Sequence, residues 1–317
     1  MKQNLGPVLL AACLILLAGC RGTSDTAAAD PTRIGVVLKT MDSEYWMNIR
    51  SGMEHAAQDA GAELVLLYPS NEWAVEEQRA MLTDLLADGS IDALVTAPCD
   101  STQVGWLADA AAAQSLPLFM TDTRAFDRSL PYIGADNRWI GTAAAEYLAD
   151  ALPAGSQVAV ITGSRWQAPL YDRVEAFRKA LKADGRISVG TICYNNSGVA
   201  DAVAVTNDLL AAGDIDGIFC TSGALGMGAV AAKTEAQSSL VLVAVDTQND
   251  ALKAVQLGSL DALISQSGYE VGQRTIACVL DRLAGQPVVL PAYVTGEVLT
   301  QENIAAYLAS QEEEGLV

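Results

Sequence analysis

The sequence predicts an α/β protein built as two doubly wound, parallel-sheet lobes. From Arg33 onward, short and nearly continuous apolar runs alternate with longer segments of helical periodicity. This alternation is typical of a parallel sheet whose strands are buried on both faces and connected by crossover helices. The pattern occurs twice along the chain, and the segment after Ser265 is too short to form a third domain. We therefore expect that last segment to cross back and complete both lobes.

The first lobe is predicted from four apolar runs and the helical segments between them. The strand candidates are Ile34–Leu38, Leu64–Leu67, Ala93–Thr96 and Leu118–Thr121. Apolar residues recur at helical spacing over Trp46–Ala60 and Glu76–Ala87. Gly61 and Gly89 follow these segments and are expected to terminate the helices.

The second lobe repeats this order with five strand candidates, namely Val158–Thr162, Val189–Cys193, Gly217–Thr221, Leu240–Val245 and Ala262–Ser265. Helices are predicted over Asp172–Ala183 and Ala202–Ala211. A further helix, Val271–Leu283, precedes two short extended pieces around Val288–Leu290 and Ala292–Thr295. The predicted lobes are residues 33–135 with 267–291, and residues 136–266 with 292–317.

The N-terminus has the features of an export signal. Lys2 precedes an apolar stretch that closes on Leu17-Ala18-Gly19-Cys20, and the stretch is shorter than the roughly 20 apolar residues that span a membrane. Leu-Ala-Gly-Cys resembles the lipobox of bacterial lipoproteins, which implies that Cys20 is acylated and becomes the mature N-terminus. We predict a signal over residues 1–20, a flexible tether over 21–32, and a location in the periplasm or on the outer face of the cytoplasmic membrane, held by lipid alone.

Composition argues against several classes of function. The chain has 19 basic and 38 acidic side chains, a formal net charge of −19, so nucleic acid is not an expected partner. His55 is the sole histidine, which leaves no material for a Ser-His-Asp triad or a multi-histidine metal site. The composition does not exclude a glycosidase that uses two carboxylates. The glycines at Gly223, Gly226 and Gly228 do not form a nucleotide-binding Gly-x-Gly-x-x-Gly, and no cofactor or metal is predicted.

The cysteines predict free thiols rather than a disulfide framework. Cys13 lies in the predicted signal and Cys20 in the lipobox. The other four, Cys99, Cys193, Cys220 and Cys278, show no close Cys-x-x-Cys spacing. Two of them end apolar runs, where a small buried hydrophobe fits.

Several short motifs follow one another in an order known from one protein family. They are Ile34-Gly35-Val36-Val37 with Tyr45-Trp46 beyond it, Thr121-Asp122-Thr123, Ile133-Gly134-Ala135-Asp136-Asn137, Asp172-Arg173-Val174-Glu175-Ala176-Phe177, Asp246 and Gln266. In this order the chain resembles the ribose-type periplasmic binding proteins of ABC importers, which share their fold with the effector domains of lactose-repressor-type regulators. The resemblance extends from Arg33 to about Tyr307. It implies two lobes joined by a multi-strand hinge, with the ligand in the cleft between them.

The resemblance also implies a set of ligand-binding residues at the carboxyl ends of the strands. They are Asp42, Ser43, Tyr45, Trp46, Asp122, Thr123 and Arg124 in the first lobe, and Tyr171, Arg173, Asn195, Ser222, Asp246 and Gln266 in the second. Carboxylates, amides and hydroxyls bind sugar hydroxyls, and aromatic rings pack against the C–H faces of a sugar.

Some of these residues have simpler interpretations. The two strand-end aspartates are also typical helix caps, the Tyr-Trp pair is also typical of a buried first turn, and Ser222 also suits a plain turn. Asp136 is expected to serve the hinge rather than the ligand.

Departures from the family pattern bear on the ligand. Ribose binders have Arg at the positions of Thr123 and Tyr171, and Asn-Asp where this chain has Ser222-Gly223. These changes favour a sugar other than ribose, with a larger or more apolar face.

The expected function is that of a monomeric solute-binding lipoprotein, not an enzyme, which delivers a sugar to ABC permease and ATPase subunits. The alternative is a receptor subunit that feeds a membrane sensor kinase, since the same closing cleft serves both functions. A repressor would require a DNA-binding motif where this chain has its export signal.

Overall fold

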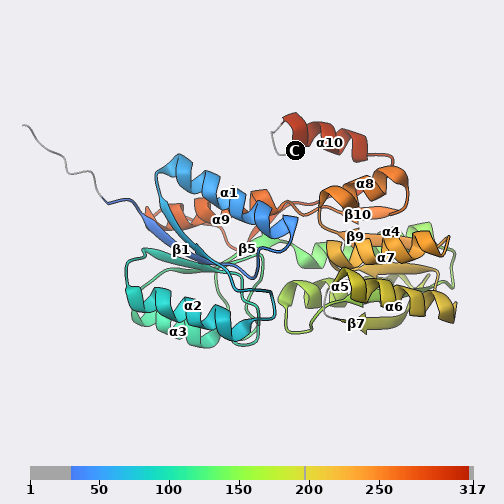
Figure 1. The fold of residues 1–317 in the computed structure, drawn as a ribbon, viewed down its shortest axis with the longest axis horizontal. Coiled ribbons are helices and arrows are strands. Elements are labelled where there is room, and N and C mark those ends of the chain that lie inside the picture. Colours follow the sequence, from blue (N-terminus) through green and yellow to red (C-terminus); the bar gives the residue numbers. More distant parts are fainter. Residues whose placement is uncertain (1–29, 196–197, 314–317) are drawn as a thin grey trace, which may run out of the picture. The chain divides into compact units, whose positions relative to one another are not determined.

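The computed structural model describes residues 30–195 and 198–313, and within them the chain forms two six-stranded sheets (Figure 1). The first has the strand order β11-β5-β4-β3-β1-β2 and the second β12-β10-β9-β8-β6-β7. All pairings are parallel except that of β12 with β10. The predicted α/β class with two parallel-sheet lobes is confirmed. The proposed signal, Cys20 and most of the tether lie outside the described residues.

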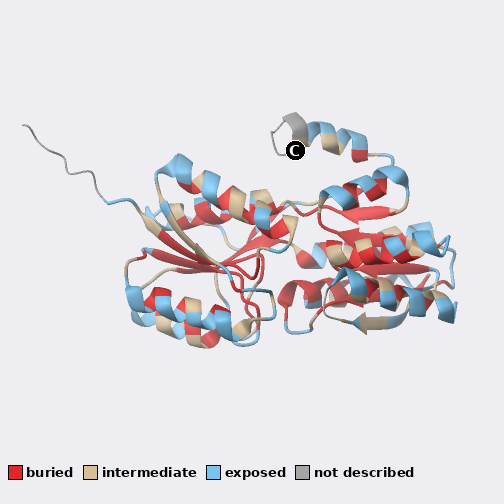
Figure 2. Cartoon of the chain, viewed as in Figure 1, coloured by how far each residue is buried: buried red, intermediate tan, exposed pale blue. Residues whose placement is uncertain are grey.

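The first lobe is a sheet with helices on both faces. Its strands are β1 (Arg33–Val37), β2 (Glu63–Leu67), β3 (Ala93–Thr96), β4 (Leu118–Thr121), β5 (Tyr132–Ala135) and β11 (Ala292–Val294). Its helices are α1 (Glu44–Ala60), α2 (Val75–Asp88), α3 (Gly105–Ala113) and α9 (Gly268–Leu283). One apolar core lies between the sheet and α1 with α9, and a second between the sheet and α2 with α3. The central strands are buried, as their uninterrupted apolar sequences predict (Figure 2).

The second lobe has the same layered build. Its strands are β6 (Gln157–Thr162), β7 (Ser188–Tyr194), β8 (Gly217–Cys220), β9 (Val241–Val245), β10 (Ala262–Ile264) and β12 (Val298–Leu299). Its helices are α4 (Asn137–Ala151), α5 (Ala168–Asp184), α6 (Val199–Ala212), α7 (Gly223–Glu235), α8 (Asn249–Leu257) and α10 (Ile304–Glu313). One core packs α4 and α5 on the sheet, and the other packs α6, α7 and α8.

Close backbone packing places the returning helix α9 on the first lobe. A Cβ atom at Gly52 of α1 would lie 2.0 Å from the carbonyl oxygen of Tyr269, and one at Gly272 of α9 would lie 2.1 Å from that of Ile49. The absence of side chains at both glycines therefore lets the two helices touch backbone to backbone. Gly61 and Gly89 end α1 and α2 in the left-handed conformation, as predicted.

Several details differ from the predictions made from the sequence, and strand β12 was also not among the strand candidates. Tyr132–Ala135 forms strand β5, which was not among the strand candidates, and Val288–Leu290 forms no strand. The segment Ala292–Val294, assigned above to the second lobe, pairs with β5 in the first sheet. Its alternating burial explains this, because Ala292 and Val294 fill the first lobe's core while Tyr293 faces outward.

The chain passes between the lobes at three places, from β5 to α4, from β10 to α9, and from β11 to β12. Asp136 lies at the first crossing, where its carboxylate accepts hydrogen bonds from the Arg138 and Trp139 amides and caps α4. The four cysteines within the described residues are free thiols, as predicted. No helix in the described part of the chain has the length and apolar character needed to cross a membrane.

Candidate ligand-binding site

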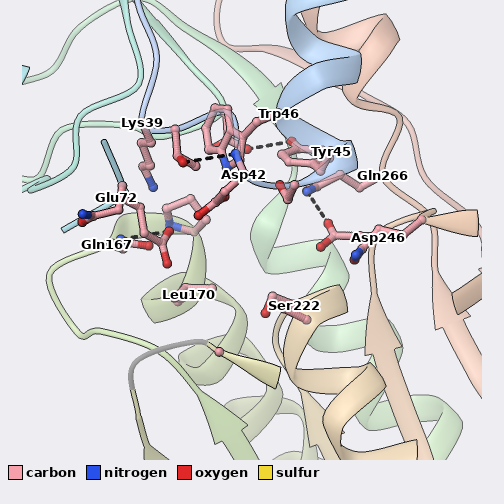
Figure 3. A pocket seen from close by; sticks show the side chains of 18 of the residues that line it. Lys39, Asp42, Tyr45, Trp46, Glu72, Gln167, Leu170, Ser222, Asp246 and Gln266 are labelled. Atoms are coloured by element: carbon pink, nitrogen blue, oxygen red, sulfur yellow. Dashed lines mark hydrogen bonds between the residues drawn. The ribbon is translucent and has the colours of Figure 1, made fainter. Parts of the chain in front are cut away.

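A cavity of about 300 Å³ lies between the two lobes, at the carboxyl ends of the strands (Figure 3). Open parallel sheets bind ligands at this edge. Nine of the residues expected at the site line the cavity: Asp42, Ser43, Tyr45, Trp46, Asp122, Arg173, Ser222, Asp246 and Gln266. The lining also includes residues that were not predicted, among them Lys39, Glu72, Trp73, Gln167, Leu170 and Gln248.

Two buried aspartates occupy equivalent positions, one in each lobe. Asp122 follows β4 and Asp246 follows β9, with φ angles of 55° and 83°. Positive φ is costly for a residue with a side chain, and such strained residues gather at functional sites. The positive φ at Asp122 and Asp246 therefore marks both residues as candidates for a functional role.

Each aspartate is held by hydrogen bonds from its neighbours. The Asp122 carboxylate accepts from the Tyr45 hydroxyl at 2.7 Å and from the Thr123 hydroxyl at 2.6 Å. The Asp246 carboxylate accepts from the Gly223 amide at 2.8 Å and from the Gln266 side-chain amide at 2.8 Å. Asp246 therefore caps the start of α7 and also lines the cavity.

Burial raises the pKa of Asp246 above its ordinary value, against the opposing effects of Arg173 and of the bond from Gly223. Burial and the Asp122 carboxylate raise the pKa of the Tyr45 hydroxyl well above its usual range. Tyr45 therefore stays protonated at neutral pH and remains a donor to Asp122.

Arg173 lines the cavity and joins three neighbouring residues by hydrogen bonds. Its buried guanidinium donates to the Asn137 side-chain oxygen at 2.8 Å, to the Thr221 carbonyl at 2.6 Å and to the Gln266 side-chain oxygen at 2.6 Å. Gln266 in turn donates to Asp246. This network connects α4, α5, β8 and the crossing after β10, and it fixes the orientation of the second lobe's acceptors.

Tyr45 and Trp46 form an aromatic wall in the first turn of α1. Their rings meet edge to face, with centroids 5.6 Å apart and planes inclined by 73°. Both side chains are buried in the first lobe's core and both line the cavity. Packing in the core and exposure to the cavity are therefore compatible for this pair.

Ser222 has a hydroxyl that fits a ligand contact. It stands at the N-cap of α7, yet its side chain makes no capping bond. Its Oγ is buried and has no hydrogen-bond partner among the described residues. Buried polar groups are rarely left unpaired, so this hydroxyl is available to a molecule in the cavity.

Four expected residues lie outside the cavity lining. The Thr123 hydroxyl is directed to Asp122, and the backbone N–H of Asn195 donates to the Thr162 carbonyl at 3.0 Å. Arg124 forms a two-pronged ion pair with Asp172 of the second lobe, at 2.8 and 2.7 Å. Tyr171 is 44% exposed.

Helix phase explains the position of Tyr171. It precedes Arg173 by two residues on α5, and at 3.6 residues per turn such residues face nearly opposite sides. Since Arg173 points into the cavity, Tyr171 points away and packs edge to face against Phe126, with centroids 5.4 Å apart.

Lys39 and Glu72 are the charged lining residues that sequence reasoning missed. Lys39 follows β1 by two residues, at the same sheet edge as Asp122. A lysine just after an apolar strand, in a chain with so many acidic residues, could have identified Lys39 as a candidate site residue from the sequence. Glu72 lies in the loop between β2 and α2, where the sequence offers no comparable pattern.

The family model described as "periplasmic binding protein domain" matches residues 34–287. The chain belongs to this family. It is 24% identical over 290 residues to the ribose import binding protein of Bacillus subtilis, an alignment that covers 89% of this chain and 93% of that protein. The resemblance to ribose-type binding proteins is thus confirmed, and these relatives are binding proteins rather than enzymes.

Solved structures show the same fold. A carbohydrate transporter solute binding protein from Agrobacterium radiobacter, in complex with D-arabinose, superimposes with a TM-score of 0.83 at 23% identity, covering 89% of this chain and 99% of that one. A periplasmic solute binding protein from Actinobacillus succinogenes with bound D-allose gives a TM-score of 0.81 at 23% identity, covering 87% and 100%.

Proposed function

We propose that this protein captures a small sugar in the interlobe cavity and delivers it, as a monomer, to the permease and ATPase subunits of an ABC importer. The observation that carries the proposal is the pairing of Asp122 and Asp246, one from each lobe, at a cavity walled by Trp46. Carboxylates accept several hydrogen bonds, and charge-assisted bonds are about twice as strong as neutral ones. An aromatic ring beside them suits the C–H face of a sugar.

The relatives support this class of ligand. The Bacillus subtilis relative is named for ribose import, and the two solved neighbours hold D-arabinose and D-allose. The chain has Thr123 where ribose binders have an arginine beside the first-lobe aspartate, and the neighbouring Arg124 is held by Asp172. We therefore propose a sugar other than ribose.

Contacts across the rim support a cavity that closes over its ligand. Besides the Arg124–Asp172 pair, the Glu44 carboxylate of the first lobe accepts from the Asn249 backbone and side-chain amides at 3.1 and 2.6 Å. Such groups meet only when the lobes approach, as in hinged binding proteins.

The test is calorimetry and thermal unfolding with D-ribose, D-arabinose, D-allose, D-galactose, D-glucose and myo-inositol. We expect at least one sugar other than ribose to bind unaltered. At 100 times its Kd, that sugar should stabilise the protein by about 2.7 kcal/mol. Small-angle scattering should show a more compact particle when it is bound. A folded protein that binds none of these compounds would contradict the proposal.

We further propose that the protein is a lipoprotein held outside the cytoplasm through Cys20, because Leu17-Ala18-Gly19-Cys20 resembles a lipobox. The Cys20→Ala variant should be released from the membrane fraction or accumulate as an unprocessed precursor. The matched control is Cys13→Ala, which should be processed and anchored like the parent. Mass spectrometry of the parent checks the idea directly, and a mature protein with an unmodified N-terminus other than Cys20 would overturn it.

A further inference from the structure

Lys39 is a buried cation without a counter-ion. The residue is 2% exposed and lines the cavity. It makes no hydrogen bond or ion pair with any residue in the described ranges 30–195 and 198–313, and its ammonium lies over the Trp46 ring, 5.8 Å from the centroid. A buried charge is costly unless it is paired. The three N–H donors of Lys39 are thus available to a molecule in the cavity.

Glu72 presents a carboxylate to the same part of the cavity. It accepts a long hydrogen bond, 3.4 Å, from the side-chain amide of Gln167, a buried residue at the start of α5 in the second lobe. Burial raises the pKa of Glu72, and Lys39 opposes this shift, which places the two charges within electrostatic reach. Yet Lys39 and Glu72 do not form an ion pair.

These residues form a site apart from the network around Asp246. Figure 3 shows Lys39, Glu72 and Gln167 on one side of the pocket and Asp246 with Gln266 on the other. Asp246, Gln266 and Arg173 are already joined to one another by hydrogen bonds. On the Lys39 side, an ammonium and a carboxylate face shared space without contact.

The chemistry of that space favours a neutral hydroxylated group. A hydroxyl can accept from Lys39 and donate to Glu72 at once. A protonated amine can pair with Glu72 but cannot accept a hydrogen bond, so it leaves Lys39 beside a like charge and without an acceptor. A ligand carboxylate can pair with Lys39 but cannot donate, so it leaves Glu72 beside a like charge and without a donor. Leaving Lys39 unpaired is costly because the residue is buried.

We propose that Lys39 and Glu72 form a paired-charge subsite that binds a hydroxyl of the sugar and rejects both cationic amino sugars and anionic sugar acids. The proposal rests on the proposed sugar-binding function and names the residues that set its charge selectivity. Gln167 holds the Glu72 carboxylate from the second lobe, so the subsite is complete only when both lobes contribute.

The experiment measures charge selectivity in the parent, Lys39→Met and Glu72→Gln. The probes are D-glucose, D-glucosamine and D-glucuronate, and the matching D-galactose, D-galactosamine and D-galacturonate series. Each is titrated as a competitor of the tightest-binding neutral sugar from the panel above. We expect Lys39→Met to improve binding of amino sugars relative to neutral sugars by roughly tenfold or more, and Glu72→Gln to do the same for the sugar acids.

Matched controls separate a local effect from the change in net charge. Lys182→Met and Glu235→Gln remove one charge each from exposed positions outside the cavity lining, and they should leave both ratios unchanged. Thermal unfolding without ligand checks that each variant is folded.

The outcomes separate the two proposals. If neutral sugars bind the parent but neither cavity variant moves its ratio beyond the controls, the subsite is overturned and sugar binding stands. A shift in the opposite direction also overturns it. If no neutral sugar binds the parent, the proposed function itself fails.

Discussion

Replacing Asp246 by Ala is expected to weaken sugar binding by about tenfold to a hundredfold. The reason is the loss of a charge-assisted hydrogen bond inside a closed cavity, worth about 1.5–3 kcal/mol. The substitution also leaves the Gln266 side-chain amide and the Gly223 backbone amide without their acceptor. Gln266 is then no longer held in its orientation beside the cavity. Calorimetry with the tightest-binding sugar of the panel measures the effect.

A nearby carboxylate provides the matched control for this variant. Asp250 lies four residues further along the chain, is exposed and does not line the cavity, so Asp250→Ala should bind sugar like the parent. Asp122→Ala should behave like Asp246→Ala, since Asp122 is the first lobe's equivalent. Parental affinity in both aspartate variants, with normal unfolding, would mean that the sugar binds elsewhere.

The raised pKa of Asp246 adds a dependence on pH. An acid whose pKa is higher in the folded than in the unfolded state destabilises the fold as its charge develops. This cost is absent below the unfolded pKa, grows as pH rises toward the folded pKa and is complete above it. Sugar affinity has the opposite trend, because the ionised form is the acceptor, and should fall as pH is lowered through the folded pKa of Asp246. In Asp246→Ala this part of the pH dependence should disappear.

Replacing Arg173 by Ala is expected to destabilise the protein by about 3–5 kcal/mol, the usual cost of removing one partner from a buried charged network. The change leaves the side-chain oxygens of Asn137 and Gln266 and the carbonyl of Thr221 without their hydrogen-bond donor. It also removes the cation that lowers the pKa of Asp246 against the effect of burial. A lower urea midpoint of unfolding, measured without ligand, is the expected result.

Two further substitutions on α5 sharpen this test. Arg178 is half-exposed and pairs with Glu175 on the helix surface, so Arg178→Ala should cost no more than about 1 kcal/mol. Arg173→Lys should lie between the parent and Arg173→Ala, because a single ammonium cannot reproduce the planar fork of a guanidinium. Equal urea midpoints for Arg173→Ala and Arg178→Ala would show that the buried network contributes little.

Much of the fold could be predicted because buried parallel strands need uninterrupted apolar runs. The runs at β1, β3, β4 and β9 have this form, and their ends marked where Asp122 and Asp246 would lie. The weaker signals failed. Strand β5 was missed because it is short and contains a glycine. The extended piece at β11 was predicted, but its three residues carry no pattern that shows which sheet they join.

The sequence by itself determined the two-lobed α/β architecture and the aspartate that follows a central strand in each lobe, since local apolar patterning and motif order are properties of neighbouring residues. The tertiary structure decided three other matters. Contact between α1 and α9 at Gly52 and Gly272 assigned the returning helix to the first lobe. The rotation of α5 turned Arg173 inward. Folding also brought Lys39 and Glu72, 33 positions apart in the chain, to one side of the cavity, because only the packing of strands and loops determines which distant charges share a buried space.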